Sequence, residues 1–187
     1  EGTHIHAESS FASEVCHVNC DCGRFLEIGN SVFMQYQKQV DGSFVKLQQQ
    51  NVDFGGGLER IMAAQQGASD VFLTDLFTPI IALLEEISGK KYSESEAIKY
   101  SFRVVLDHLR AAVFLASDGV FPSNKEQGYF ARRLVRRAIR HAQILGITRS
   151  FIAELVPVIA AIYADAYPEL TKGQEVISAG LSKEEAQ

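Results

Sequence analysis

The sequence predicts an α+β fold, in which an antiparallel sheet is followed by an all-helical region. Runs rich in β-branched and aromatic residues, separated by turn residues, are confined to the first part of the chain. Beyond residue 70, apolar residues recur at helical spacing over long stretches. We therefore expect two domains, one over residues 1–70 and one over residues 71–187.

Short runs with the composition of strands occur in the first part, and they cover residues 32–37, 44–47 and 51–53. The dipeptide Asp41-Gly42 between the first two runs is a strong signal for a hairpin turn. Glycines at positions 55–57 end the third run, and residues 58–64 after them have the composition of a helix. These signals predict an antiparallel sheet that ends in a strand–glycine–helix junction.

Helical segments are expected in the second part over residues 74–88, 93–118, 123–146 and 151–167. The tetrapeptides that begin at Ser93 and Ser123 have the pattern of capping boxes, with glutamate three residues after serine. The apolar stripe of the second segment consists of Ile98, Phe102, Val105, Leu106, Leu109, Val113 and Ala116. We expect Pro157 to interrupt the last segment. The chain begins with Glu1 and ends in helix-like sequence, so we expect it to be a piece of a longer polypeptide.

Composition excludes several classes of protein. Hydrophobic residues make up 47% of the 187 residues, which is enough for a buried core. The net charge of −5 and the pI near 5.5 argue against a surface that is basic throughout, so contact with nucleic acid has to come from a local patch. No apolar run of about 18 or more residues occurs, so no membrane-spanning helix is expected.

Cys16, Cys20 and Cys22 form a tight cluster around His17. An odd number of clustered cysteines is a poor disulfide framework and indicates a reduced, cytoplasmic protein. The thiolates and a histidine could bind Zn²⁺, although their spacing differs from the standard zinc motifs. Burial of small thiols in a core explains the cluster equally well.

The glycine-rich junction is flanked by Asp53 and Arg60. Glycines between a strand and a helix let the backbone approach a flat ligand, and the helix N-terminus favours negative charge. The guanidinium of Arg60 can contact a phosphate or stack on a base, and Asp53 can hold an ammonium group. A solvated glycine-rich turn is the alternative. The motif is neither a Walker A loop nor a dinucleotide-binding fingerprint.

The third expected helix carries a cluster of arginines, with no acidic residue between Tyr129 and Ile147: Arg132, Arg133, Arg136, Arg137 and Arg140. Like charges at this spacing repel, so the helix needs an anion or a set of carboxylates beside it. In an acidic chain the cluster indicates contacts with nucleic-acid phosphates. Internal pairing with acids such as Asp107 or Asp118 is the alternative.

Glu27 and Asn30 lie on the strand that leads into Val32. A carboxylate and an amide at this spacing could serve Mg²⁺ and a substrate. A polar strand edge is the simpler interpretation.

The order of these motifs resembles that of alanyl-tRNA synthetases. The first block comprises Glu27-Ile28-x-Asn30-x-Val32-Phe33-Met34-Gln35, Val52-Asp53-x-Gly55-x-Gly57-Leu58-Glu59-Arg60 and Thr74-Asp75-Leu76-Phe77. The second block comprises Arg103-Val104-x-x-Asp107-His108-Leu109-Arg110, Asp118-Gly119-Val120-x-Pro122-Ser123-Asn124 and Gly128-Tyr129-x-x-Arg132-Arg133-x-x-Arg136-Arg137-Ala138-x-Arg140-His141. The resemblance is dense over residues 24–147 and loose elsewhere.

The resemblance implies part of a class II catalytic sheet and an enzyme that activates alanine with ATP and Mg²⁺, then transfers it to the 3′ end of alanine tRNA. The implied catalytic residues are Asp53 and Arg60. The positions implied to contact alanine are Asn30, Val32, Asp53 and Gly55. The positions implied to contact ATP or Mg²⁺ are Glu27, Gly57 and Arg60.

The resemblance also implies that Asn124 and the arginine-rich helix lie along the acceptor stem of alanine tRNA. The family reads a G·U pair there, and the wide minor groove of RNA exposes such a pair. Other class II motifs would precede Glu1 and a tRNA-reading aspartate would follow Gln187, so this segment alone is expected to be inactive. A non-catalytic RNA-binding module derived from a synthetase is the alternative function.

The chain departs from the family pattern beside the expected alanine pocket. Gly29 stands where the family usually has tryptophan. Phe54 replaces the usual threonine and Gly56 the usual methionine.

Overall fold

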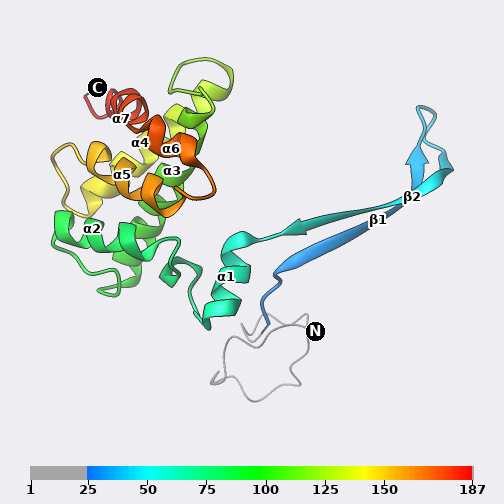
Figure 1. Ribbon diagram of the computed structural model, residues 1–187, viewed down its shortest axis with the longest axis horizontal. Coiled ribbons are helices and arrows are strands. Elements are labelled where there is room, and N and C mark those ends of the chain that lie inside the picture. The colour runs from blue at the N-terminus through cyan, green and yellow to red at the C-terminus, as the bar shows by residue number, and fades with distance from the viewer. Residues whose placement is uncertain (1–24, 187) are drawn as a thin grey trace. The chain divides into compact units, whose positions relative to one another are not determined.

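The computed structural model describes residues 25–186 and divides into two compact units, Glu1–Thr74 and Asp75–Gln187 (Figure 1). In its described part, the first unit contains a two-stranded antiparallel sheet, one α-helix and a short 3₁₀ helix. The described part of the second unit is helical. The expected α+β fold is therefore confirmed. The assignment of the parts to a catalytic and a tRNA-recognition domain stays a prediction.

Strands β1 (Gly29–Lys38) and β2 (Phe44–Gly56) form an antiparallel hairpin. Its turn is at the expected dipeptide, where Gly42 has a φ of +86° that glycine adopts without strain. Asp41 Oδ1 accepts hydrogen bonds from N and Oγ of Ser43 at 2.9 and 2.6 Å, and these bonds lower the pKa of Asp41. The turn is thus stabilised by its own side chains.

The expected third strand, residues 51–53, is not separate: it continues β2 and pairs with residues 32–34 of β1. The prediction was wrong because the polar residues before Asn51 contain no glycine or proline, and so they prolong the strand. The pairing is irregular between Met34 and Tyr36, where residues 47–50 of β2 stand against the single position 35 of β1. This irregularity separates an outer half with the turn from an inner half that leads to the next helix.

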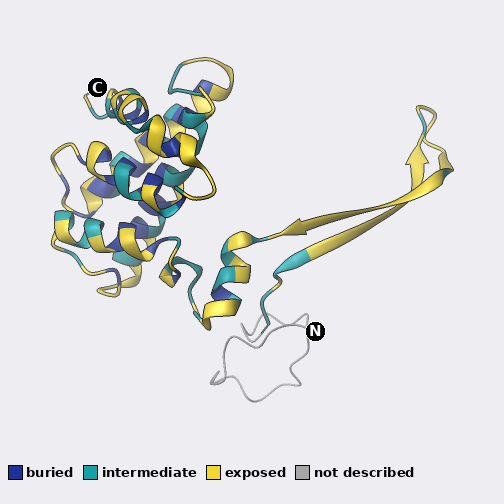
Figure 2. Ribbon diagram, in the orientation of Figure 1, coloured by how far each residue is buried: buried dark blue, intermediate teal, exposed yellow. Residues whose placement is uncertain are grey.

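Helix α1 (Leu58–Gln66) begins after the N-cap Gly57, and the short 3₁₀ helix η1 spans Val71–Leu73. Burial differs sharply between the two units (Figure 2). Almost every residue of the hairpin is exposed, including Phe33 at 71%. The helices of the second unit instead turn buried faces inward.

The helices of the second unit are α2 (Thr78–Ser88), α3 (Glu96–Ser117), α4 (Glu126–Ile144), α5 (Ile152–Ile162), α6 (Pro168–Lys172) and α7 (Gln174–Ser182). The predicted apolar stripe of α3 is buried from Phe102 to Ala116, while Ile98 is half-buried. Pro157 lies inside α5 and does not interrupt it. Leu155, Val156 and Ile159 around it are fully or almost fully buried, and this packing offsets the lost hydrogen bond.

Both expected capping boxes are wrong in detail. Ser95, rather than Ser93, is the N-cap of α3, and its side chain accepts a hydrogen bond from the N–H of Ile98 at 3.3 Å. Ser123 does not cap α4, whose N-cap is Lys125. The N–H of Ser123 instead donates to the carbonyl of Gly128 at 2.9 Å, and this bond folds the loop before α4 back onto the first turn of the helix.

Candidate functional site

The inner half of the hairpin brings the predicted alanine contacts together. Val32 pairs with Asp53, and Asn30 pairs with Gly55. Directly opposed residues of an antiparallel pair, and residues two apart on one strand, share a face of the sheet. Asn30, Val32, Asp53 and Gly55 therefore form one quartet, defined here as the hairpin quartet, which combines a carboxylate, an amide and a small apolar side chain.

The start of α1 is tied to the residues before β1. The Nη1 atom of Arg60 donates to the backbone carbonyl of Glu27 at 2.9 Å, and the N–H of Gly57 donates to the carbonyl of Ile28 at 3.0 Å. Arg60, Gly57 and Glu27, the predicted ATP and Mg²⁺ contacts, are thus adjacent. The side chain of Asp53 accepts one hydrogen bond, from the N–H of Phe54 at 2.9 Å, and its second oxygen has no partner among the residues described.

The predicted zinc ligands Cys16, Cys20 and Cys22 lie outside the described residues. Within residues 25–186, no three histidine, cysteine, aspartate or glutamate side chains are grouped so that they could hold a metal ion.

Helix α4 separates its apolar and basic residues. Its buried positions are Gly128, Ala131, Val135, Ala138 and Ala142. Its exposed arginines are Arg133, Arg136, Arg137 and Arg140. Arg133 and Arg140 have no hydrogen-bond or ion-pair partner in the described part of the chain, while Nη2 of Arg137 donates to the hydroxyl of Tyr100 at 3.1 Å. The exposed face of α4 therefore carries two cations, Arg133 and Arg140, that no residue of the described part of the chain neutralises.

The neighbouring His141 responds to this charge. Burial lowers the pKa of His141, and the charges of Arg137 and Arg140 lower it further. Its Nδ1 atom lies 3.2 Å from Oγ of Ser101. The local potential is thus positive enough to disfavour a further proton.

Arg132 differs from the other arginines of α4, because its side chain is only 19% exposed and contacts Glu184. The Nε and Nη2 atoms of Arg132 both lie 2.9 Å from Oε1 of Glu184. The expected alternative of internal pairing therefore holds for this arginine, with an acid that the sequence did not name. No ion pair among the described residues joins the α4 arginines to Asp107 or Asp118, although the charge of Arg137 helps to lower the pKa of Asp107, after the larger effect of its hydrogen bond with His108.

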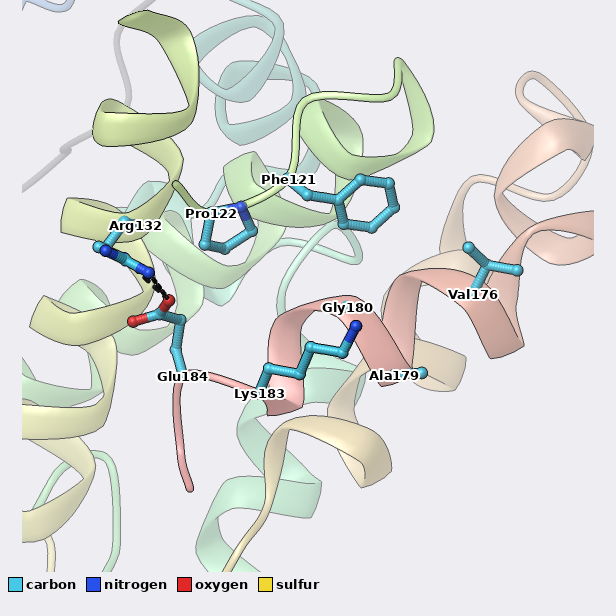
Figure 3. A pocket seen from close by; sticks show the side chains of 8 residues that line it. All are labelled: Phe121, Pro122, Arg132, Val176, Ala179, Gly180, Lys183 and Glu184. Atoms are coloured by element: carbon cyan, nitrogen blue, oxygen red, sulfur yellow. Dashed lines mark hydrogen bonds and ion pairs between the residues drawn. The ribbon is translucent and has the colours of Figure 1, made fainter. Parts of the chain in front are cut away.

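Glu184 is a residue that the sequence did not single out. It stands beside Glu185 in the helix-like sequence at the end of the chain. Its side chain is in fact 3% exposed, because the segment after α7 folds against α4 (Figure 3). A contact so distant in sequence leaves no local signal.

Comparison with known proteins places these features in a family. The family model described as tRNA synthetases class II (A) matches residues 3–187. The chain belongs to the class II tRNA synthetases.

Several curated relatives of this class II synthetase chain are similar over most of its length. The alanine–tRNA ligase of Borreliella burgdorferi is 46% identical over 97% of the chain, and that of Borreliella afzelii is 48% identical over 91%. The alanine–tRNA ligase of Desulfitobacterium hafniense is 45% identical over 91% of the chain. The chain spans only 31%, 29% and 19% of the lengths of these three relatives.

Gly29, Phe54 and Gly56, at which this class II synthetase departs from the pattern expected of alanyl-tRNA synthetases, lie next to one another. A Cβ atom added to Gly29 would lie 2.9 Å from the ring of Phe54, and one added to Gly56 would lie 3.1 Å from the same ring. Gly29 pairs with Gly56, and Phe54 lies on the same face, opposite to the hairpin quartet. The two glycines therefore make room for the aromatic ring, and the three departures form one packed unit.

A cavity of about 350 Å³ in this class II synthetase lies beside the exposed arginines and is lined by His108, Phe130, Arg133, Leu134 and Arg137. Phe130 is exposed there. Cationic side chains around an exposed aromatic ring are chemically suited to a phosphate and an adjacent base.

Within residues 25–186, no helix is both long enough and apolar enough to cross a membrane.

Proposed function

We propose that this chain is part of an alanine–tRNA ligase, which activates alanine with ATP and transfers it to the 3′ end of alanine tRNA. The observation that carries the proposal is the hairpin quartet next to the contact between Arg60 and Glu27. The name of the relatives that align over 91–97% of the chain supports the same reaction. A cytoplasmic location, expected from the clustered cysteines, is part of the proposal.

The hairpin quartet suits alanine. The Asp53 carboxylate has an oxygen without a partner among the residues described, and it would bind the alanine ammonium in a charge-assisted contact. Val32 and Gly55 share its face and would leave room for one methyl group. Asn30 would line the same pocket. Because a methyl-sized pocket rejects glycine and serine poorly by binding alone, this site fits an enzyme that also needs editing.

The start of α1 suits ATP. Arg60 and the N-terminal end of α1 at Gly57 favour phosphate oxygens. The Glu27 side chain is exposed, and its oxygens fit Mg²⁺, which commonly takes one or two carboxylates together with substrate phosphates. When bound, Mg²⁺ would neutralise phosphate charge. These residues would position the alanine carboxylate for attack on the α-phosphate, with pyrophosphate as the leaving group.

The helical unit suits the acceptor stem. Arg133, Arg136, Arg137 and Arg140 would contact phosphates on the exposed face of α4. Asn124, in the loop before α4, would read the G·U pair of alanine tRNA from the minor groove. The contact of Arg132 with Glu184 removes that arginine from the set of phosphate contacts.

The decisive experiment uses the complete protein and measures alanine-dependent exchange of pyrophosphate into ATP. Asp53→Ala is expected to lower the exchange rate by about 100-fold or more, because a charged hydrogen-bonding partner of the ammonium is lost. Asp41→Ala is the matched control on the same hairpin, since Asp41 contacts only its own turn. Near-normal exchange in the Asp53→Ala variant contradicts the proposed alanine site.

The alternative function, a non-catalytic RNA-binding module, would give a different result in these measurements. Such a protein would bind an acceptor-stem hairpin but show no alanine-dependent exchange, even without a substitution. That result would reject the ligase proposal and retain the RNA-binding face of α4.

A further inference from the structure

A chain of contacts links the segment after α7 to the loop before α4. Glu184 contacts Arg132 through its Oε1 atom, and the two side chains point toward one another beside a cavity of about 540 Å³ (Figure 3). The cavity is lined by Phe121, Pro122, Arg132, Val176, Ala179, Gly180, Lys183 and Glu184. Nη1 of Arg132 in turn donates to Oδ1 of Asn124. Glu184 and Asn124 are thus joined through a single guanidinium.

The guanidinium fixes which end of the Asn124 amide faces outward. Arginine only donates hydrogen bonds, so the atom of Asn124 beside it has to be the carbonyl oxygen. The Nδ2 atom of Asn124 makes no hydrogen bond to a described residue. Asn124 is exposed. It therefore offers two N–H donors to the outside, with its acceptor end held by Arg132.

The position of the Arg132 side chain is fixed in turn, because Arg132 and Glu184 are both largely buried. Its side chain is 19% exposed and that of Glu184 is 3% exposed, so neither charge is well solvated. Breaking such a pair leaves an uncompensated charge, and a long arginine side chain then moves toward water. Arg136 does not replace Arg132, because its Nε atom lies 3.9 Å from Oε2 of Glu184 and its side chain is 59% exposed.

We propose that Glu184 is a positioning residue for tRNA discrimination: through Arg132 it holds Asn124 so that the Asn124 amide presents donors to the acceptor stem. The inference rests on the proposed function and deepens it. The acceptors in the RNA minor groove are pyrimidine O2, purine N3 and the 2′-hydroxyl. A side chain held in advance loses less rotamer freedom on binding, so the preorganised amide binds more tightly than a mobile one.

The test uses the complete protein and compares aminoacylation kcat/KM on alanine tRNA with that on the same tRNA carrying G·C in place of G·U. Glu184→Ala is expected to lower the preference for G·U by about five- to tenfold, the loss of roughly one hydrogen bond. Asn124→Ala should lower it at least as much, because it removes the donors themselves. The double variant should be no worse than Asn124→Ala alone, because Glu184 acts only through Asn124.

Two further variants separate positioning from general loss of structure. Glu184→Gln should lower the preference less than Glu184→Ala does, since both Arg132 contacts go to Oε1 and glutamine keeps an acceptor there although it loses the charge. Glu185→Ala is the matched control: the Glu185 side chain accepts from the N–H groups of Phe151 and Ile152, away from Arg132. It should leave the preference intact. Alanine-dependent pyrophosphate exchange, which needs no tRNA, should be unchanged in the Glu184 and Glu185 variants.

The outcomes are distinguishable. If the unsubstituted protein shows no alanine-dependent exchange or no G·U preference, the proposed function fails and the inference falls with it. If Asn124→Ala loses the preference while Glu184→Ala keeps it, the positioning role of Glu184 alone is wrong. If Glu184→Ala lowers activity on both tRNAs equally, Glu184 is a structural residue and the positioning role is likewise wrong.

Discussion

The hairpin and the helical unit hold their functional side chains in different ways. In the hairpin, strand register alone brings Asn30, Val32, Asp53 and Gly55 to one face, and almost every residue is exposed. In the helical unit, Asn124 is held by a side chain that is itself anchored by a nearly buried carboxylate. Backbone pairing therefore positions the proposed alanine site, whereas side-chain packing positions the proposed RNA contact.

This difference has a consequence for mutation. A site made by register tolerates changes of neighbouring side chains, because the hydrogen-bonded backbone keeps its alignment. A site held through a buried ion pair depends on residues far from it in the sequence, as Glu184 is from Asn124. Substitutions in the two regions test this contrast.

Truncation of the α3 core should have the largest effect. Phe102 is fully buried, and Phe102→Ala is expected to destabilise the helical unit by about 3–5 kcal/mol. Phe33→Ala is the matched control in the exposed hairpin, where a change within about 0.5 kcal/mol is expected. Denaturant unfolding followed by helical circular dichroism measures the loss in Phe102→Ala, and amide hydrogen exchange of β1 and β2 measures that in Phe33→Ala. Equal losses would break the contrast between the two regions.

The arginines of α4 should separate into two classes. Arg140→Gln removes a cation that has no partner among the described residues, so it should lower the log–log salt slope of acceptor-stem binding by about one unit. The G·U and G·C hairpins should weaken alike. Arg132→Gln should leave the slope nearly unchanged and reduce the G·U preference, because this arginine contacts Glu184 and Asn124. Fluorescence titration of labelled hairpins at several salt concentrations measures these slopes. Identical behaviour of the two variants would contradict the division.

The packing of Phe54 on the hairpin glycines should give a smaller effect. Gly29→Ala places a methyl group against the Phe54 ring and is expected to destabilise the inner half of the hairpin by about 1 kcal/mol. The exposed ring can move, so the cost stays modest. Phe54→Thr in the same chain should remove the clash. Amide hydrogen exchange of β1 and β2 measures the effect, and a loss that persists in the double variant would reject the packing explanation.

His141 should give the smallest effect. Its pKa lies below the ordinary value of 6.5, because of burial and the adjacent arginines. The folded state therefore favours the neutral ring of His141. The contribution of this ring to the free energy of unfolding is complete above about pH 6.5, and it is lost as the pH falls from 6.5 to the lowered pKa. His141→Gln should remove this part of the pH dependence of unfolding. Phosphates near Arg137 and Arg140 would offset their charge, so nuclear magnetic resonance titration should show a higher His141 pKa with RNA bound. An unchanged pKa would place the RNA elsewhere.

The sequence predicted the features that depend on local patterns. The hairpin turn, the α3 stripe and the α+β order follow from turn chemistry and apolar spacing, and the structure confirms them. The helix start after Ser95 was missed because Ser93 has the same capping chemistry, and the start after Lys125 was missed because lysine is not a capping residue. Pro157 was misread because tertiary packing offsets a local cost. Glu184 was invisible for a related reason: its contact with Arg132 spans 52 residues.

The irregular pairing between Met34 and Tyr36 has an evolutionary consequence. It interrupts the alignment between the outer half of the hairpin and the inner half that carries the quartet. A residue inserted or deleted near the turn shifts the pairing of the outer half, but the shift can be taken up where residues 47–50 already stand against one position. Descendants of this chain can therefore vary the length of the hairpin tip without reversing the faces of Val32 and Asp53.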